Sequence, residues 1–372
     1  MGGGVMGASI AFHLAEAGVR DVLLLERDEL ASGSTSRAAG GVRAQFSDEL
    51  NIRIALRSLE AFRAFEERPG WDIGLHQVGY LFLLTREEDV ERFRGDIALQ
   101  NALGVPSELL TPDEVAARCP LVVTDDVLAG AFCALDGHAT PEAVVQGYAT
   151  GARAHGATLV THCAVEGVEV DGGEVRAVRA GGQRVETQAV VCAAGAWSRV
   201  VAALAGVDLP VEPLRRQVLT TGPMPGLDPR TPITIDFATS FYFHGEGPGL
   251  LLGMSDPDET PGFKLTESDA WLAGLGAAIE RRAPALGEVG LGPGWAGLYE
   301  MTPDHNALVG EAEGVSRFLY AAGFSGHGFL MGPAIGEVMR DLYLGRSPVV
   351  DVSPLTAGRF ADAGLRPELN IV

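Results

Sequence analysis

The sequence has 372 residues, of which 47% are hydrophobic and 21% charged, and this composition is typical of a globular chain rather than a disordered one. Acidic residues outnumber basic residues by 49 to 28, and the net charge of −21 repels nucleic-acid phosphates and anionic membranes, so we expect neither as a partner. The apolar runs are far shorter than a membrane span.

The four cysteines indicate a reducing environment. They form no C-x-x-C pair and no metal-ligand spacing, so we expect free thiols and no metal site. The beginning of the sequence also lacks the pattern of a secretory signal peptide. We therefore expect a cytoplasmic protein.

The sequence opens with a glycine-rich turn, MGGGVMG, in which Gly2, Gly4 and Gly7 satisfy G-x-G-x-x-G. Apolar residues at helical spacing follow as far as Gly18, and "DVLLLE" then predicts a short buried strand that ends at Glu26. In dinucleotide-binding units, such glycines let the backbone approach a pyrophosphate at a helix N-terminus, and an acid near this spacing contacts a ribose. The alternative is a glycine-rich terminus in front of an ordinary surface helix.

One part of such a unit is missing, because only Met1 precedes the turn where a central parallel strand is expected. Either the given sequence begins downstream of the true start, or the domain lacks this strand. The second case would cost ladder hydrogen bonds and packing, so we favour the first.

The next segment, "ASGSTSRAAGGVRAQFS", predicts a loop of small residues. Ser34 and Ser36 offer hydroxyl groups, and Arg37 and Arg43 offer guanidinium groups suited to a bidentate anion. The alternative is a loop with solvated arginines.

The remaining elements alternate between helices and strands. A helix over 51–65, the strand "HQVGYLFLLT" and a helix after Glu87 precede a further helix that starts at Pro141. A β-meander then leads into "VVCAAGAWS" and a second glycine turn at Gly195. Strands and turns over 216–260, a helix around 267–281 and the strand "RFLYAAG" follow.

The last motif is "AAGFSGHGFLMGPAIGEVMRDLYLG", an amphipathic helix that ends at Gly345 and has glycines crowded in front of it. Nucleotide-type segments thus lie at both ends and in the middle of the chain. We expect an α/β protein with a discontinuous cofactor domain over 1–70, 140–215 and 300–372. The substrate domain is expected over 71–139 and 216–299.

Taken in order, "GGGVMG…LLLE", "SGSTSRAAGG", "VVCAAGAWS", "YEMTPDHNALVGE" and "AAGFSGHGF" resemble the D-amino-acid oxidase superfamily of FAD-dependent enzymes. The resemblance is strongest to sarcosine oxidase β-subunits, dimethylglycine dehydrogenases and related proline dehydrogenases. It implies a Rossmann-like FAD-binding domain with an inserted α+β substrate domain built on an antiparallel sheet.

The resemblance also implies which residues hold FAD. The glycine turn would face the pyrophosphate, Glu26 the adenosine ribose and Val165 the adenine, and residues 323–330 would wrap the flavin ring. The implied cofactor-binding residues are Gly2, Gly4, Gly7, Glu26, Arg27, Ser34, Ser36, Arg37, Ala38, Val165, Gly195, Trp197, Gly323, Ser325, Gly326, Gly328, Phe329 and Leu330.

Three residues are the implied catalytic candidates. Arg43 would hold the substrate carboxylate, Tyr299 would line the substrate pocket, and His327 would lie close to the flavin. A surface arginine and a core tyrosine are the alternatives for the first two.

Departures from the family pattern refine this expectation. Gly297 and Arg37 stand where related enzymes attach flavin covalently, so FAD is expected to bind non-covalently. Met254 stands where monomeric sarcosine oxidases have a lysine that helps the flavin react with oxygen. Leu330 stands where they have a lysine that binds the substrate carboxylate. Dehydrogenase chemistry therefore stays open beside oxidase chemistry.

The expected reaction is oxidation of the C–N bond of a small N-methyl, cyclic or secondary amino acid, with hydride transfer to flavin N5. Oxygen or another acceptor would take the electrons, and a homo- or hetero-oligomer is compatible with the family. One alternative is a flavoprotein without turnover of its own or a subunit of a larger complex. A nicotinamide-dependent dehydrogenase is a further alternative, but it leaves the C-terminal glycine motif unexplained.

Overall fold

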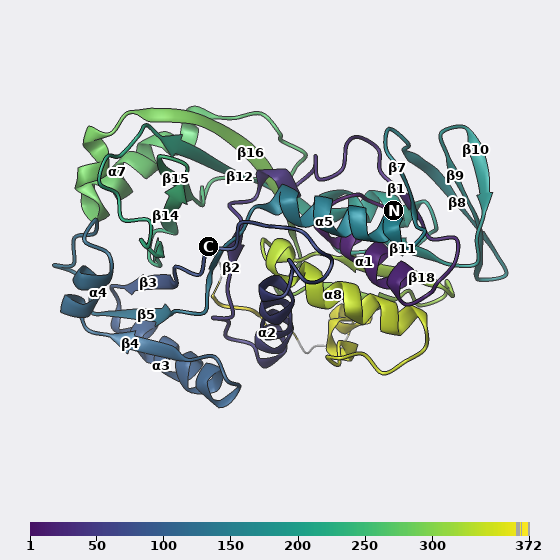
Figure 1. Ribbon diagram of the computed structural model, residues 1–372, viewed down its shortest axis with the longest axis horizontal. Helices are drawn as coiled ribbons and strands as arrows, with labels where there is room; N and C mark the ends of the chain where they lie inside the picture. Colours follow the sequence, from purple (N-terminus) through teal and green to yellow (C-terminus); the bar gives the residue numbers. More distant parts are fainter. Residues whose placement is uncertain (362–364, 366, 371–372) are drawn as a thin grey trace.

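The structure is a computed structural model that describes residues 1–361, 365 and 367–370. Two lobes lie side by side in Figure 1, one around α1 and α8 and the other around a large sheet that contains β12 and β16. The chain passes repeatedly between the lobes, because both contain segments from the first and second halves of the sequence.

The first lobe combines helices with several small sheets. Its helices are α1 (Val5–Glu16), α2 (Glu49–Arg63), α5 (Pro141–Ala154), α6 (Ser198–Ala203) and α8 (Gly328–Tyr343). Its strands are β1 (Leu23–Leu25), β2 (Gly41–Val42), β6 (Gly137–His138), β7 (Thr158–Val160), β8 (Val165–Asp171), β9 (Glu174–Ala180), β10 (Gln183–Glu186), β11 (Val190–Cys192), β17 (Leu308–Glu311) and β18 (Phe318–Ala322). Single helical turns are η1 (Thr35–Arg37), η2 (Gly195–Trp197), η5 (Ser353–Leu355) and η6 (Ala357–Phe360).

Helix α1 is the centre of this lobe. Its side chains are almost all buried, because it packs against α8 on one side and α5 on another. A glycine in α8 makes the close approach possible: a Cβ on Gly336 would lie 2.1 Å from the Ser9 hydroxyl oxygen of α1. The predicted first helix is thus a buried core helix rather than a surface helix.

The central parallel sheet is divided into two parts. Strand β1 pairs in parallel with β7, and β11 pairs in parallel with β18, which continues to β17. The first two residues lie between these parts: Gly2 N–H donates to Leu25 O at 2.9 Å, and Ala193 N–H donates to Met1 O at 2.9 Å. Met1 and Gly2 therefore lie at the position of the expected central strand, and the glycine turn follows directly.

The second lobe is built on one eight-stranded sheet with the order β16-β12-β15-β14-β13-β3-β5-β4. Every neighbouring pair is antiparallel except β13 and β3, which are parallel. The strands are β3 (Tyr80–Leu84), β4 (Ser107–Leu110), β5 (Ala129–Cys133), β12 (Glu212–Thr221), β13 (Ile233–Asp236), β14 (Phe241–Glu246), β15 (Gly249–Met254) and β16 (Leu291–Met301). The helices are α3 (Glu87–Ala102), α4 (Pro112–Arg118) and α7 (Leu272–Arg282), with turns η3 (Asp269–Trp271) and η4 (Pro284–Glu288).

This arrangement confirms the predicted fold class, an α/β protein with a large sheet beside the nucleotide-type lobe. The proposed domain boundaries stay predictions, and β12 and β16 both run across them. Two details differ from expectation. A threonine in front of Pro141 suggests a side-chain cap for α5, but the Thr140 side chain makes no cap hydrogen bond. Helix α7, expected from about residue 267, begins at Leu272 because residues 269–271 form the tighter turn η3.

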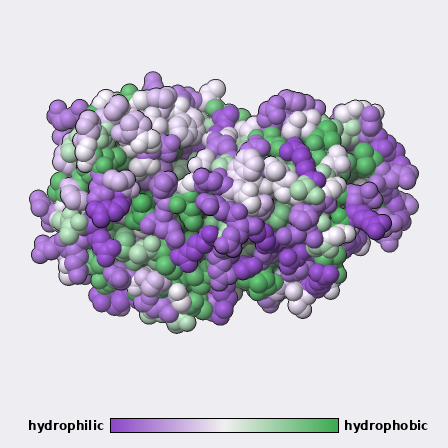
Figure 2. Space-filling view, in the orientation of Figure 1, coloured by the Kyte–Doolittle hydropathy of each residue, from purple (hydrophilic) through white to green (hydrophobic). Residues whose placement is uncertain are grey.

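The surface is mixed. Figure 2 shows hydrophilic and hydrophobic residues interspersed over the face that it draws. Among the residues that the structure describes, no helix combines the length and the apolar character needed to cross a membrane. The four cysteines are unpaired, and Cys163 is only partly buried.

Candidate active site

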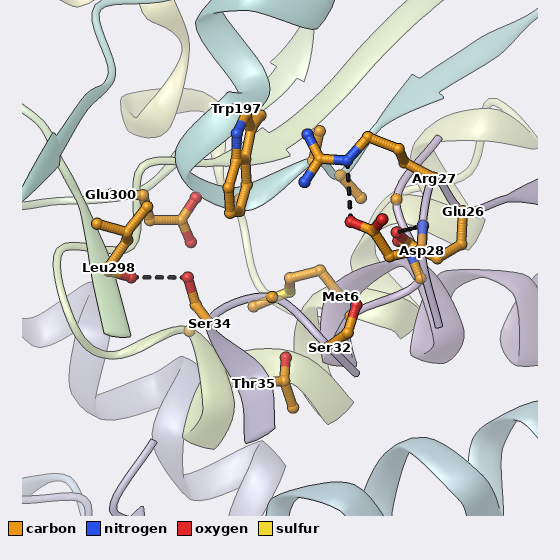
Figure 3. Close-up of a pocket in the computed structure, with 18 of the residues that line it drawn as sticks. Met6, Glu26, Arg27, Asp28, Ser32, Ser34, Thr35, Trp197, Leu298 and Glu300 are labelled. Atoms are coloured by element: carbon orange, nitrogen blue, oxygen red, sulfur yellow. Dashed lines mark hydrogen bonds and ion pairs between the residues drawn. The ribbon is translucent and has the colours of Figure 1, made fainter. Parts of the chain in front are cut away.

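A cavity of about 570 Å³ runs between the glycine turn of the first lobe and strands β12 and β16 of the second. This is a usual size for a small-molecule or cofactor site. In Figure 3, Glu300 lies on one side of the cavity and Glu26 and Arg27 lie on the opposite side, with Trp197 between them. The cavity therefore has Glu300 and Glu26 on opposite sides.

The glycine turn forms one wall. Gly2 has a φ of +105°, and a Cβ there would lie 2.3 Å from Ala193 O, so only glycine fits. A Cβ on Gly7 would lie 1.8 Å from Gly2 O, so Gly7 lets the helix pack against the turn rather than lining the cavity. Helix α1 has no acidic residue in its first turn, and its N-cap, Gly4, makes no side-chain cap. The positive end of the helix dipole is thus open to an anion.

Glu26 closes one end of the cavity. Its carboxylate accepts hydrogen bonds from Gly3 N–H at 2.6 Å and from Asp28 N–H at 2.8 Å. The acid after β1 therefore holds the glycine turn in place while it borders the cavity. Arg27 lies beside it, with its guanidinium carbon 4.9 Å from the Trp197 ring centre.

The loop at η1 is tied to strand β16. The Ser34 hydroxyl donates to Leu298 O at 2.7 Å, and Arg37 Nη1 donates to Ala296 O at 2.7 Å. Gly297 allows this approach, because a Cβ there would lie 2.9 Å from the Cβ of Arg37. Arg37 was expected to bind an anion. In the structure, one nitrogen of its guanidinium instead forms a hydrogen bond that connects the two lobes.

The glycine motif before α8 has an inner and an outer part. Gly326, Gly328 and Phe329 line the cavity. Gly323, Ser325 and Leu330 do not: Gly323 N–H donates to the Glu300 carboxylate at 2.9 Å, and Ser325 N–H donates to the Glu300 backbone oxygen at 3.1 Å. Leu330 belongs to the hydrophobic core.

Arg43 and His327 meet outside the residues that line the cavity. Arg43 Nη2 lies 3.1 Å from His327 Nε2, and the guanidinium also donates to the backbone oxygens of Gln45 and Asn370. Its carbon lies 4.2 Å from the Phe46 ring centre. Burial lowers the pKa of Arg43, and burial together with the Arg43 charge holds the pKa of His327 well below its usual value. Their suggested roles stay predictions.

Tyr299 lines the cavity, and its predicted role at a substrate pocket stays a prediction. Two charged residues that were not predicted lie close to it. Arg216 on β12 has its guanidinium carbon 5.1 Å from the Tyr299 ring centre, and its buried Nε has no hydrogen-bond partner among the described residues. Glu300 is the next residue on β16. The available signals were the pair Arg215–Arg216 and a single acid in the apolar stretch "GWAGLYEM".

The predicted cofactor residues divide accordingly. Those that line the cavity are Gly2, Gly4, Glu26, Arg27, Ser34, Arg37, Ala38, Val165, Gly195, Trp197, Gly326, Gly328 and Phe329. Those outside it are Gly7, Ser36, Gly323, Ser325 and Leu330. Among the described residues, no group of three or more His, Cys, Asp or Glu side chains is placed to hold a metal ion.

A glycine turn at a buried helix, an acid after the next strand and an adjoining sheet-based lobe define a dinucleotide-binding protein of two lobes. The sequence pattern of the FAD dependent oxidoreductase family matches residues 1–342, so the chain belongs to this family. Its cofactor is FAD, and the predicted recognition and enzyme class are confirmed.

Individual relatives support the same assignment. The chain is 32% identical to "Dimethylglycine dehydrogenase, mitochondrial" of Rattus norvegicus, over 97% of this chain and 44% of that protein. It therefore spans less than half of that relative's length. It is 32% identical to "FAD-dependent oxidoreductase domain-containing protein 1" of Xenopus laevis, over 100% of this chain and 84% of that one.

Solved structures share the fold over nearly the whole chain. An L-proline dehydrogenase from P. horikoshii superposes with a TM-score of 0.92 at 34% identity, covering 98% of this chain and 97% of that one. A glycine oxidase from Geobacillus kaustophilus superposes with a TM-score of 0.86 at 26% identity, covering 96% of this chain and 97% of that one.

The cavity fits FAD on its own geometry. Gly2 and Gly7 stand where any Cβ would strike backbone oxygen, and the positive end of α1 is free of acidic side chains in its first turn. This is the cradle that a pyrophosphate requires. The residues that would hold the dinucleotide are the glycine turn and Glu26, with Ser34 and Trp197 along its length.

Proposed function

We propose that this protein oxidises the C–N bond of a small N-methyl, cyclic or secondary amino acid with FAD as the hydride acceptor. The relatives named dimethylglycine dehydrogenase and L-proline dehydrogenase support this substrate class. The observation that carries the proposal is the cavity itself, which joins a dinucleotide cradle to a pocket lined by Tyr299 and Arg216. FAD, when bound, supplies the acceptor for two electrons and one proton.

We assign the substrate carboxylate to Arg216. The guanidinium borders the cavity over Tyr299, and its buried Nε has no hydrogen-bond partner within the described part of the chain. A buried, unsatisfied donor is stabilised when an anion binds, and a bidentate carboxylate matches the guanidinium fork. Arg43, the candidate suggested by the sequence, already donates to two backbone oxygens and contacts His327.

The chain's own contribution is orientation and exclusion of water. Arg216 would fix the carboxylate, and the Tyr299 ring would form an apolar surface beside the reacting carbon. Burial raises the pKa of the Tyr299 hydroxyl, although the Arg216 charge opposes this, so the phenol stays neutral at physiological pH. No nucleophile or metal is needed for hydride transfer in this arrangement.

Anaerobic reduction of the purified, FAD-loaded protein tests the function. We expect sarcosine, dimethylglycine, proline or a similar amino acid to bleach the flavin absorbance. The variant Arg216→Leu should raise KM by about 100-fold or more, a loss of about 3 kcal/mol, because a charge-assisted pair is removed. Arg216→Lys should recover part of this loss.

Three outcomes would redirect the proposal. If no amino or imino acid reduces the bound flavin, the protein is the non-catalytic or subunit-type flavoprotein. A protein that binds a nicotinamide nucleotide in place of FAD would contradict the family assignment itself. If KM is unchanged in Arg216→Leu and raised in Arg43→Leu, Arg43 rather than Arg216 binds the substrate carboxylate.

We further propose a cytoplasmic location and reoxidation by oxygen or by another acceptor. The unpaired cysteines and the net charge of −21 support the location. Rates of reoxidation by oxygen and by a soluble dye acceptor, compared after reduction by substrate, would decide between oxidase and dehydrogenase. Sedimentation of the purified protein would show whether it forms the expected oligomer.

A further inference from the structure

The Glu300 carboxyl group lies where the cavity, strand β16 and the start of α8 meet. Its Oε2 accepts a hydrogen bond from Gly323 N–H at 2.9 Å, and Phe324 N–H also hydrogen-bonds the carboxylate. A Cβ on Gly328, the first residue of α8, would lie 3.4 Å from Glu300 Oε1. The second oxygen therefore lies close to the first residue of α8, and the side chain borders the cavity.

This position belongs to the flavin end of the cavity. Dinucleotide folds place the pyrophosphate at the glycine turn. They place a ribose at an acidic residue after the strand that follows the first helix, and here that strand is β1 and the acid is Glu26. FAD is an elongated molecule, so its isoalloxazine ring belongs at the end away from Glu26. Glu300 lies on the side of the cavity opposite to Glu26 (Figure 3).

Among the residues that the structure describes, the carboxyl group has no cationic partner. Burial is the main influence on it: desolvation raises the pKa of Glu300 to about 7, against the opposing effect of the two backbone N–H groups. No ion pair involving Glu300 occurs within the described part of the chain. At the cavity, the nearest elements carry Tyr299 on β16, Arg216 on β12 and Arg37 on η1. Cys192 on β11 interacts electrostatically with Glu300, and His327 precedes α8. Further along the same elements, β12 carries Glu212 and Arg215, and α8 carries Glu337, Arg340, Asp341 and Tyr343.

We propose that Glu300 faces the isoalloxazine of bound FAD and takes up one proton when the cofactor is reduced. The inference rests on FAD binding in this cavity and on no particular substrate. A hydride carries two electrons and one proton to the flavin, and the amine that loses it becomes an iminium ion. Reduced flavin would carry one negative charge, and this charge would disfavour a second one on Glu300. A proton from solvent then converts the carboxylate to the acid, so reduction takes up two electrons and two protons.

Redox potentiometry tests the coupling directly. The FAD-loaded protein is titrated anaerobically with dithionite at a series of pH values from 6 to 9. One proton per two electrons changes the midpoint potential by about 30 mV per pH unit, and two protons change it by about 59 mV. We expect the wild type to follow the steeper slope above about pH 7. Glu300→Gln, which keeps the size of the side chain, should follow the shallower slope throughout.

Two further variants control for a general disturbance of the site. Asp28→Asn removes a carboxylate that lines the same cavity near Glu26, and its slope should match that of the wild type. Glu300→Asp keeps a titratable group, so its slope should be steeper than that of Glu300→Gln. Dithionite supplies the electrons, so the absence of amino-acid turnover would not affect this measurement.

The FAD-free protein offers an independent readout. The raised pKa means that folded protein holds the Glu300 proton more tightly than unfolded protein does. The stability contribution is therefore present at low pH and lost as the pH rises from about 4.3 through about 7. We expect Tm to fall more between pH 5 and pH 8 in the wild type than in Glu300→Gln.

Two results would overturn the proposal. One is a wild-type slope of about 30 mV per pH unit from pH 6 to pH 9, which would show that no second proton is coupled. This result decides the matter even if Glu300→Gln fails to fold. The other is a variant that folds, binds FAD and keeps the steeper slope, because the second proton would then reside elsewhere.

Discussion

The carbonyl oxygen of Gly2 lies 1.8 Å from the point where Gly7 would place a Cβ atom. The first turn of α1 therefore packs directly against the glycine turn that borders the cavity. No side chain fits at position 7. The two glycines therefore have different functions within one motif: Gly2 borders the cavity, and Gly7 brings the helix close to it.

Gly7→Ala is expected to destabilise the protein and weaken FAD binding together. The added methyl group meets backbone rather than a flexible side chain, so the turn must shift, at a cost of about 1–3 kcal/mol. Urea denaturation and FAD titration of the apo-protein measure the two effects. Gly276→Ala in α7 is the matched control, because a Cβ there contacts nothing within 4 Å. Equal losses in both variants would contradict the packing explanation.

Glu26→Gln is expected to raise the Kd for FAD about tenfold, equivalent to about 1.4 kcal/mol. The amide oxygen still accepts from Gly3 N–H, but the charged acceptor that borders the cavity is lost. Fluorescence titration of the apo-protein measures this change. Glu29→Gln should leave Kd unchanged, because Glu29 pairs with His162 outside the residues that line the cavity. A Kd that stays at the wild-type value in Glu26→Gln would remove the ribose assignment.

Acid precipitation is expected to release all of the FAD into the supernatant. Gly297 and Arg37 provide no nucleophile where related enzymes attach flavin. Cys163 does line the cavity, but it adjoins Val165, on the side assigned to adenine. Absorbance of the supernatant and of the redissolved pellet measures the partition. A coloured pellet after unfolding would mean that a covalent bond had formed.

Glu337 and Glu60 both pair with Arg57, and neutralising each of them should have a different effect on the free energy of unfolding. Arg57 donates two hydrogen bonds of 2.7 Å to Glu337, which is 5% exposed, and one to Glu60, which is 64% exposed. Glu337→Gln should cost about 1–3 kcal/mol of unfolding free energy, because it removes the charge from a buried carboxylate that accepts two hydrogen bonds from Arg57. Glu60→Gln should cost less than about 0.5 kcal/mol. Similar costs in the two variants would contradict this ranking.

The same pair predicts the behaviour of the protein in acid. Burial alone would raise the pKa of Glu337, but the Arg57 hydrogen bonds and charge outweigh it and lower this pKa. A lowered pKa stabilises the fold above the unfolded value of about 4.3, and the contribution is lost as the pH falls below it. Urea denaturation between pH 7 and pH 3 should therefore show a steeper loss of stability for the wild type than for Glu337→Gln. Parallel profiles would mean that other carboxylates dominate.

The sequence motifs that line the cavity could be predicted because the local conformation of each motif depends on residues that are neighbours in the chain. A glycine turn, a helix of small apolar residues and an acid at the end of the next strand lie within the first 26 positions, and the structure places them together. Helix and strand periods likewise predicted most elements. The resemblance of whole motifs added the cofactor, which no single motif specified.

The partners of the charged residues could not be read in this way. Glu300 acquires its pKa from burial and from a turn 23 residues further along the chain, and Arg43 is held by a backbone oxygen 327 residues away. Such contacts depend on how the two lobes close on each other, and local patterns carry no information about that.

The sequence by itself thus determined a dinucleotide-type glycine turn and the order of the segments around it, because backbone conformation at glycine and helix periodicity are local properties. Only the tertiary structure decided that Arg216 and Glu300 border the cavity while Arg43 and His327 pair outside it. The physical reason is that desolvation and hydrogen-bond satisfaction of a charged side chain are set by residues distant in the chain.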